Sequence, residues 1–134
     1  MPSRFDGAAG APKPMGPYSA CVETDGLVLC SGQIGRDPET NALALGMAGQ
    51  TSMALLNLEA VLKSVGLGLD SVVKTTVFIT DMTKFQQMND EYAKHFGQPY
   101  PARSTVQVAA LPSGAEVEIE AIAVRGTGRG HSRL

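Results

Sequence analysis

The spacing of hydrophobic and polar positions changes several times along the chain, and each change marks an expected element. Apolar side chains alternate with polar ones, or cluster as branched residues, in segments that are typical of β-strands. In two other segments they recur every three or four residues, as on one side of an amphipathic helix. The expected strands are 17–23, 27–30, 72–80, 99–108 and 117–124, and the expected helices are 47–65 and 83–96.

The element order, ββαβαββ, favours an α+β fold in which a mixed sheet carries both helices on one face. A chain of 134 residues has the size of one domain, so we expect a single domain over 1–134. Within it we expect an irregular N-terminal arm at 1–15 and a flexible, Gly-rich basic tail at 126–134. No element remains to cover the second sheet face, which predicts a homo-oligomer.

The last two strands carry the charged residues that we expect to form the functional site. A turn-rich loop at 111–115 separates them, so we expect them to pair as a hairpin. Arg103 and Thr105 share a polar face of the first strand, and Glu120 lies on a polar face of the second. Pairing of Thr105 with Glu120 would make Arg103 a diagonal cross-strand neighbour of Glu120, on the same face of the sheet. An ordinary ion pair on a solvated sheet face explains the same spacing.

The first two strands form a second expected hairpin, because Asp25-Gly26 is a strong two-residue turn signal. Such a turn puts Cys21 opposite Cys30, which makes a disulfide conceivable. Directly paired strand positions rarely suit disulfide geometry, so we expect two free, largely buried thiols. Ser31-Gly32 at the end of this hairpin indicates either a close approach of the backbone to a ligand or an ordinary bulge.

Composition and charge argue against several classes of function. A net charge of -2 gives no electrostatic reason to expect nucleic acid or an anionic membrane as partner. No run approaches the roughly 20 apolar residues that span a bilayer, and the N-terminus has no signal-peptide pattern, so we expect a cytoplasmic protein. The two cysteines lie in one expected hairpin, remote in sequence from both histidines, so no metal site is predicted. No Ser-His-Asp or Cys-His arrangement is recognisable.

Several separated motifs, in order, make the chain resemble the RidA/YjgF family of enamine and imine deaminases, also described as endoribonuclease L-PSP-like proteins. The resemblance covers nearly the whole chain. Its motifs are Gly16-Pro17-Tyr18-Ser19, residues 28–34 with Ser31-Gly32-Gln33, residues 73–78, Pro101-Ala102-Arg103-Ser104-Thr105-Val106, and residues 118–123. The resemblance implies a chorismate-mutase-like fold assembled as a homotrimer, with active sites in the clefts between subunits.

The resemblance also implies a reaction and roles for individual residues. The reaction is hydrolysis of 2-aminoacrylate-type 2-enamino or 2-imino acids to 2-oxo acids and ammonia, with no metal or organic cofactor. Arg103 would bind the substrate carboxylate, and Glu120, just before the Ala-Ile-Ala run, would position the attacking water. The residues lining the pocket would be Tyr18, Ser31, Gly32 and Thr105.

Two other functions are compatible with the fold. A trimer could bind small carboxylates such as 2-oxo acids without turning them over. RNA cleavage is a further possibility, but the acidic net charge and the lack of a basic aromatic face argue against it. Three positions depart from the commonest family pattern: Ala20, Gly35 and Thr105, where many relatives have cysteine. Their effects on the pocket and its loops stay open.

Overall fold

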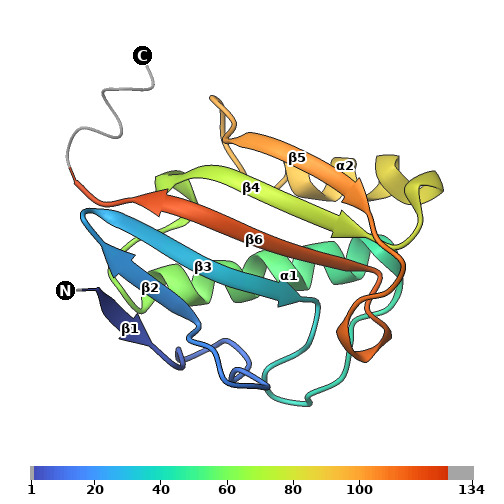
Figure 1. The fold of residues 1–134 in the computed structure, drawn as a ribbon. Helices are drawn as coiled ribbons and strands as arrows, with labels where there is room; N and C mark the ends of the chain where they lie inside the picture. Colours follow the sequence, from blue (N-terminus) through green and yellow to red (C-terminus); the bar gives the residue numbers. More distant parts are fainter. Residues whose placement is uncertain (1, 127–134) are drawn as a thin grey trace.

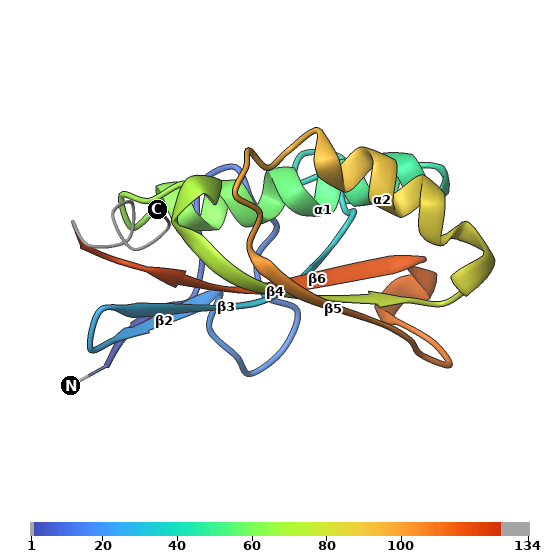
Figure 2. The same cartoon turned by 90° about the horizontal axis from the view of Figure 1, so that it is seen from above.

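The computed structural model describes residues 2–126 as one six-stranded mixed sheet with two helices on one face (Figure 1). The strands are β1 (Ser3–Phe5), β2 (Cys21–Thr24), β3 (Leu27–Ile34), β4 (Val72–Ile79), β5 (Ala102–Gln107) and β6 (Val117–Val124). The helices are α1 (Gly46–Lys63) and α2 (Phe85–Ala93). Short 3-10 turns lie at Leu69–Ser71, Met82–Lys84 and Pro112–Gly114. The expected α+β arrangement is therefore confirmed, and Figure 2 shows both helices on the same side of the sheet.

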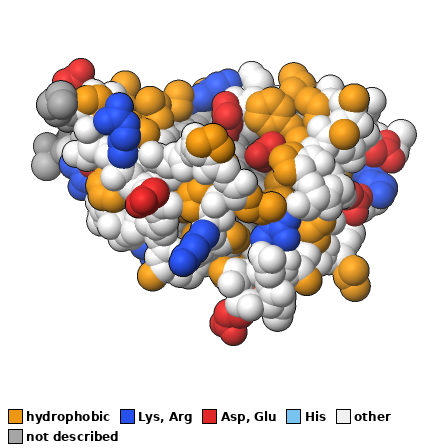
Figure 3. Space-filling model, turned by 60° about the horizontal axis from the view of Figure 1, so that its bottom comes forward, with side chains coloured by type: hydrophobic (Ala, Val, Ile, Leu, Met, Phe, Trp, Pro, Cys, Tyr) orange, Lys and Arg blue, Asp and Glu red, His pale blue; other side chains and the backbone are white. Residues whose placement is uncertain are grey.

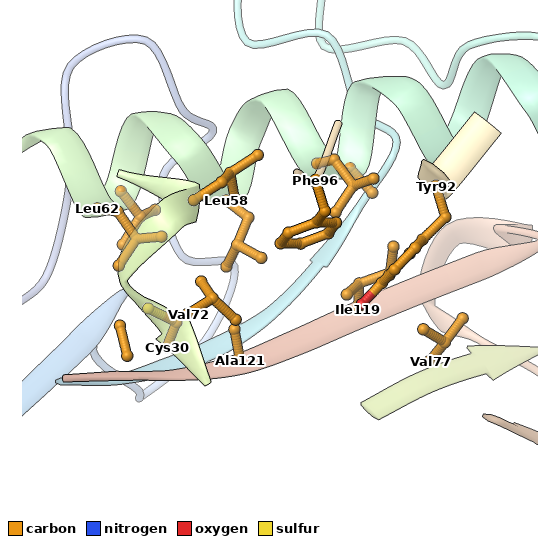
Figure 4. Close-up of a cluster of buried hydrophobic side chains, with 14 of the residues drawn as sticks. Cys30, Leu58, Leu62, Val72, Val77, Tyr92, Phe96, Ile119 and Ala121 are labelled. Atoms are coloured by element: carbon orange, nitrogen blue, oxygen red, sulfur yellow. The ribbon is translucent and has the colours of Figure 1, made fainter. Parts of the chain in front are cut away.

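One apolar core fills the space between the helices and the covered sheet face (Figure 4). Leu58 and Leu62 point down from α1, and Ile119 and Ala121 point up from β6. The two leucines and Ile119 have no exposed surface. Complete burial of a side chain of this size contributes about 1.5–3 kcal/mol, so the core fixes the helices on the sheet.

Both helices end earlier than the expected 47–65 and 83–96, and α2 begins at Phe85, after the 3-10 turn at Met82–Lys84 that Asp81 caps. After α1 the N–H of Gly66 donates to the carbonyl of Lys63 at 3.0 Å, and the N–H of Leu67 donates to the carbonyl of Leu62 at 2.9 Å. Ahead of α2 the Asp81 carboxylate accepts a hydrogen bond from the N–H of Thr83 at 3.0 Å. Both patterns satisfy backbone groups that a helix end leaves without partners inside the helix.

The first hairpin also forms as expected. Cys21 lies directly opposite Cys30 on β2 and β3, and both thiols are free and buried. Asp25 and Gly26 both have positive φ, of 51° and 80°, as a tight two-residue hairpin turn requires. Burial, with a smaller contribution from Cys21, raises the pKa of the Cys30 thiol to about 12. Cys30 is therefore not a thiolate nucleophile near neutral pH.

The N-terminal segment departs from the expected irregular arm at 1–15. Residues 3–5 form β1, an edge strand in which Arg4 pairs with Val22 of β2. A three-residue strand is too short to show a period in its side chains, which is why the pattern did not reveal it. The order of elements is thus βββαβαββ. The tail expected at 126–134 lies, from residue 127 onward, outside the described residues.

The expected pairing of the last two strands is wrong. The sheet order is β1-β2-β3-β6-β4-β5, so β4 separates β5 from β6. β4 pairs with β5 in parallel, with Thr75 opposite Arg103, and with β6 antiparallel, with Thr76 opposite Glu120. A parallel pair needs a crossover connection, and α2 supplies it between β4 and β5. Thr105 and Glu120 are therefore not partners.

Gly35 brings the loop after β3 into contact with the backbone of α1. A Cβ at this position would lie 2.6 Å from both the Cα and the carbonyl oxygen of Gln50. The Gln50 side chain in turn accepts a hydrogen bond from the N–H of Glu116 at 2.8 Å. The loop after β3, the helix and the start of β6 are thus packed as one unit.

We predict that Gly35→Ala lowers the free energy of unfolding by about 1–3 kcal/mol, because backbone atoms of α1 must move to admit the methyl group. Urea unfolding at one fixed protein concentration measures the change. Gly97→Ala is the matched control, since an added Cβ there meets nothing within 4 Å. Equal losses in the two variants would contradict the packing argument.

Candidate active site

Arg103 lies on the helix side of β5, beside α2. Its guanidinium carbon is 4.8 Å from the ring centroid of Tyr92 and 5.6 Å from that of Phe85. Stacking on aromatic rings stabilises a guanidinium without neutralising its charge. Within residues 2–126, no carboxylate forms an ion pair with Arg103. The cation is therefore held in place and remains available to an anion.

A pocket of about 430 Å³ opens beside this cation. It is lined by Asn89, Tyr92, Ala93, Tyr100, Pro101 and Arg103. The Tyr92 hydroxyl lies 2.7 Å from Thr75 Oγ1, and this buried hydrogen bond fixes the aromatic ring under the guanidinium. Thr105 follows two residues after Arg103, and its buried Oγ1 has no hydrogen-bond partner within the described residues. We call this the Arg103 pocket.

A second pocket, of about 250 Å³, lies where the segment before β2 meets the end of β3. Tyr18, Gly32 and Glu118 line it together, and we call it the Glu118 pocket. Ser31 anchors the Tyr18 segment, because its hydroxyl donates to the carbonyl of Ser19 at 2.6 Å. The pairing of β3 with β6 is irregular between Cys30 and Gln33, so Ser31-Gly32 does form a bulge, and that bulge borders a pocket.

Glu118 lies on the open face of the sheet, between apolar side chains. Its direct neighbours in the adjacent strands are Ile34 and Phe78. Burial raises the pKa of the Glu118 carboxyl, and the nearby charge of Glu120 raises it further. A Cβ on Gly32 would lie 2.6 Å from Glu118 Oε2, so the glycine leaves the space that the carboxyl fills. Sequence reasoning did not select Glu118 as a site residue. The feature that distinguishes it is its position between two apolar cross-strand neighbours.

The structure brings only part of the predicted site together. Tyr18 and Gly32 line the Glu118 pocket, and Ser31 anchors the segment that carries Tyr18. Arg103 lies on β5, which β6 and β4 separate from β3. Arg103 is turned toward the helices, and Glu120 lies exposed on the opposite face. The predicted approach of Arg103 to Glu120 is therefore wrong within one chain.

The described residues show neither a metal-binding cluster nor a membrane-spanning helix. Within residues 2–126, no group of three or more His, Cys, Asp or Glu side chains is placed to hold a metal ion. Over those residues, no helix combines the length and the apolar character needed to cross a membrane. The cytoplasmic location stays a prediction. Together the two pockets are lined by side chains that carry guanidinium, ammonium, carboxyl, amide and phenol groups.

Comparison with known proteins places the chain in a family. The family model described as Endoribonuclease L-PSP matches residues 8–125. The human (Homo sapiens) 2-iminobutanoate/2-iminopropanoate deaminase is 43% identical over 124 residues, covering 92% of this chain and 90% of that protein. Crystal structures of RidA from an Antarctic Psychrobacter (39% identity, TM-score 0.88) and of E. coli TdcF with bound serine (38% identity, TM-score 0.86) each cover 92% of this chain and 100% of theirs. The chain belongs to the Endoribonuclease L-PSP family, which is the RidA/YjgF family.

Proposed function

We propose that the protein is an imine deaminase, which hydrolyses small 2-enamino or 2-imino acids of the 2-aminoacrylate type to 2-oxo acids and ammonia. The observation that carries this proposal is the pair of pockets, one presenting an unpaired guanidinium and the other a carboxyl of raised pKa. Relatives at 43–46% identity named 2-iminobutanoate/2-iminopropanoate deaminase support it. The serine bound to the related TdcF supports a ligand of amino-acid size.

Arg103 binds the substrate carboxylate in this proposal. A guanidinium offers parallel N–H donors that match the two oxygens of a carboxylate, which a lysine ammonium cannot do. The aromatic ring of Tyr92 restricts the plane of the Arg103 fork, so a bound carboxylate also fixes the direction of the imine carbon. Asn89 adds an amide group at the same pocket.

Glu118 carries the proton transfers. Water adds to the imine carbon, a C–O bond forms, and a proton passes from the water to the nitrogen. The hydroxyl of the resulting carbinolamine then gives its proton to the nitrogen as the C–N bond breaks, which releases ammonia and leaves the carbonyl of the 2-oxo acid. A carboxyl can accept and return this proton most effectively when its pKa is close to the working pH. Burial among apolar side chains moves the pKa of Glu118 in that direction.

The proposal extends to the assembly. The Arg103 and Glu118 pockets open on different parts of one chain, so they can act on one substrate only across a subunit boundary. We propose a chorismate-mutase-like homotrimer in which the Arg103 pocket of one subunit faces the Glu118 pocket of the next. The open sheet face supports such an interface: Leu27 and Leu29 are 41% and 40% exposed, and Ile122 lies opposite Leu29. Hydrophobic side chains also reach the surface between charged ones in Figure 3.

Glu118→Gln should lower kcat/KM by about 100-fold or more, the usual effect of losing a general acid–base group. The Glu120→Gln variant should lose less than about tenfold, because Glu120 is exposed and lines neither pocket. The assay measures 2-oxo acid formed from imines generated in place by an amino acid oxidase.

The opposite ranking of the two variants would return the acid–base role to Glu120, where the family resemblance put it. A wild-type protein that binds 2-oxobutanoate but does not accelerate hydrolysis would instead establish a binding function without turnover.

A site shared between subunits predicts complementation. Arg103→Met and Glu118→Gln are each expected to be inactive alone. After the two variants are refolded together in equal amounts, about one quarter of the shared sites should contain both intact residues. Activity should return to about that fraction of the wild-type value, and sedimentation should show a trimer. Mixed samples that stay inactive would show that both residues serve the same subunit.

The charge of Glu120 should be visible in the titration of Glu118. Removing that charge by Glu120→Gln lowers the pKa of the Glu118 carboxyl, because one of the two causes of its upward shift is lost. NMR titration of the glutamate side-chain carboxyl carbons measures the change, and the acidic limb of the kcat/KM profile should move to lower pH with it. Glu116→Gln is the control, since Glu116 pairs with Lys84 at 2.8 Å and does not shift Glu118. If the pKa of Glu118 changes equally in both variants, Glu120 is not the charge that raises it.

A further inference from the structure

A second arginine lines the Glu118 pocket. Arg36 follows β3, and only 7% of its surface is exposed. Its Nη1 donates to the carbonyl of Asn41 at 2.7 Å, and its Nη2 donates to the hydroxyl of Ser113. Both acceptors are neutral oxygens, one from the loop after β3 and one from the loop before β6. Arg36 is thus fixed at the pocket wall by contacts that leave its charge in place.

The positive charge of Arg36 has no counter-charge in the described chain. Within residues 2–126, no carboxylate forms an ion pair with it. A guanidinium has five N–H donors, and two are used by Asn41 and Ser113. The Nε of Arg36 is buried and has no hydrogen-bond partner among the described residues. A buried, unpaired charge is costly, and an anion at the pocket would reduce that cost.

The rest of the pocket favours an anionic ligand at the Arg36 side. Lys13 lines the same pocket and adds a second positive charge. Glu118 is its one described acidic lining residue, and burial favours the neutral form of that carboxyl. The volume of about 250 Å³ suits a small metabolite.

We propose that Arg36 binds a second anionic group of the substrate, which makes the protein selective for 2-imino dicarboxylates, the imines of acidic amino acids. This inference rests on the proposed function: Arg103 binds the carboxylate next to the imine carbon, and Arg36 binds the carboxylate at the far end. Hydrolysis consumes one water and yields a 2-oxo dicarboxylate and one ammonia. The reaction that supplies the substrate must therefore transfer two electrons from the C2–N bond of an acidic amino acid to an oxidant such as a flavin, or eliminate a leaving group from C3 of a 3-substituted acidic amino acid.

The competing interpretation is that Arg36 serves only to tie two loops together. In that case its loss would disturb the pocket through the contact with Ser113, and its charge would be irrelevant to the choice of substrate. Ser113→Ala separates the two interpretations, because it removes the tie to the second loop and leaves the guanidinium in place.

The experiment compares kcat/KM for two imines made in place by a flavin amino acid oxidase, one from aspartate and one from 2-aminobutyrate. Wild type should prefer the dicarboxylate, and Arg36→Met should lower the ratio of the two values at least tenfold. Ser113→Ala should keep the wild-type ratio. A wild type that prefers the monocarboxylate tenfold or more overturns the inference, whether or not Arg36→Met folds. Equal falls in the ratio for Arg36→Met and Ser113→Ala overturn it as well.

Calorimetric binding of oxaloacetate, a 2-oxo dicarboxylate, and of 2-oxobutanoate tests the subsite without turnover. Oxaloacetate should bind more tightly to wild type, and Arg36→Met should abolish that difference. If wild type hydrolyses neither imine but shows this Arg36-dependent binding, the deaminase proposal fails and the anion subsite stands. If both imines are hydrolysed but Arg36→Met leaves the binding difference and the ratio unchanged, the subsite fails and the deaminase proposal stands.

Discussion

The sealing of one sheet face by α1 and α2 is the constraint on which the rest of the molecule depends. Side chains along a strand alternate between its two faces, so an inward position fixes the direction of its neighbours. Ile119 and Ala121 of β6 are buried against the helices, and this turns Glu118 and Glu120 outward. On β5 the same rule turns Arg103 inward, because it pairs with Thr75, which has no exposed surface. The core therefore separates the cation from both acids within one chain, which is why the proposed shared site needs a second subunit.

Local patterns predicted the elements well, because the signals for α1, α2, β4 and β6 lie within each segment. The sheet order depends on contacts between distant segments, and here the sequence misled us. A short turn-rich loop between 99–108 and 117–124 favoured a hairpin, as local signals alone would. The competing signal was the helix between β4 and β5, which makes a crossover unit and brings those two strands together in parallel. Once β5 occupies one edge of β4, β6 pairs with the other edge.

Some of the motif residues border the pockets of the candidate site, whereas Glu118, which stands out by its burial, was not predicted. Gly32 and Tyr18 belong to recognisable motifs, and both border the Glu118 pocket. Glu118 and Glu120 have the same parity on the same strand, so the sequence cannot rank them by period alone. Their neighbours across the sheet distinguish them: Ile34 and Phe78 flank Glu118, whereas Thr76 lies opposite Glu120. Those neighbours are fixed by register, which is a property of the folded sheet.

Three arginines of the described chain, Arg36, Arg103 and Arg125, differ in what their guanidinium groups contact. Arg125 binds both carboxylate oxygens of Glu23, at 2.5 and 3.0 Å, and the carbonyl of Val65 at 2.6 Å, so its donors and its charge are used within the fold. Arg103 rests on aromatic rings, and Arg36 donates to neutral oxygens. A carboxylate partner would neutralise the charge of a guanidinium, whereas aromatic rings and neutral oxygens position the guanidinium and leave its charge uncompensated. A side chain held in this second way retains the capacity to bind an anion, and both such arginines line pockets.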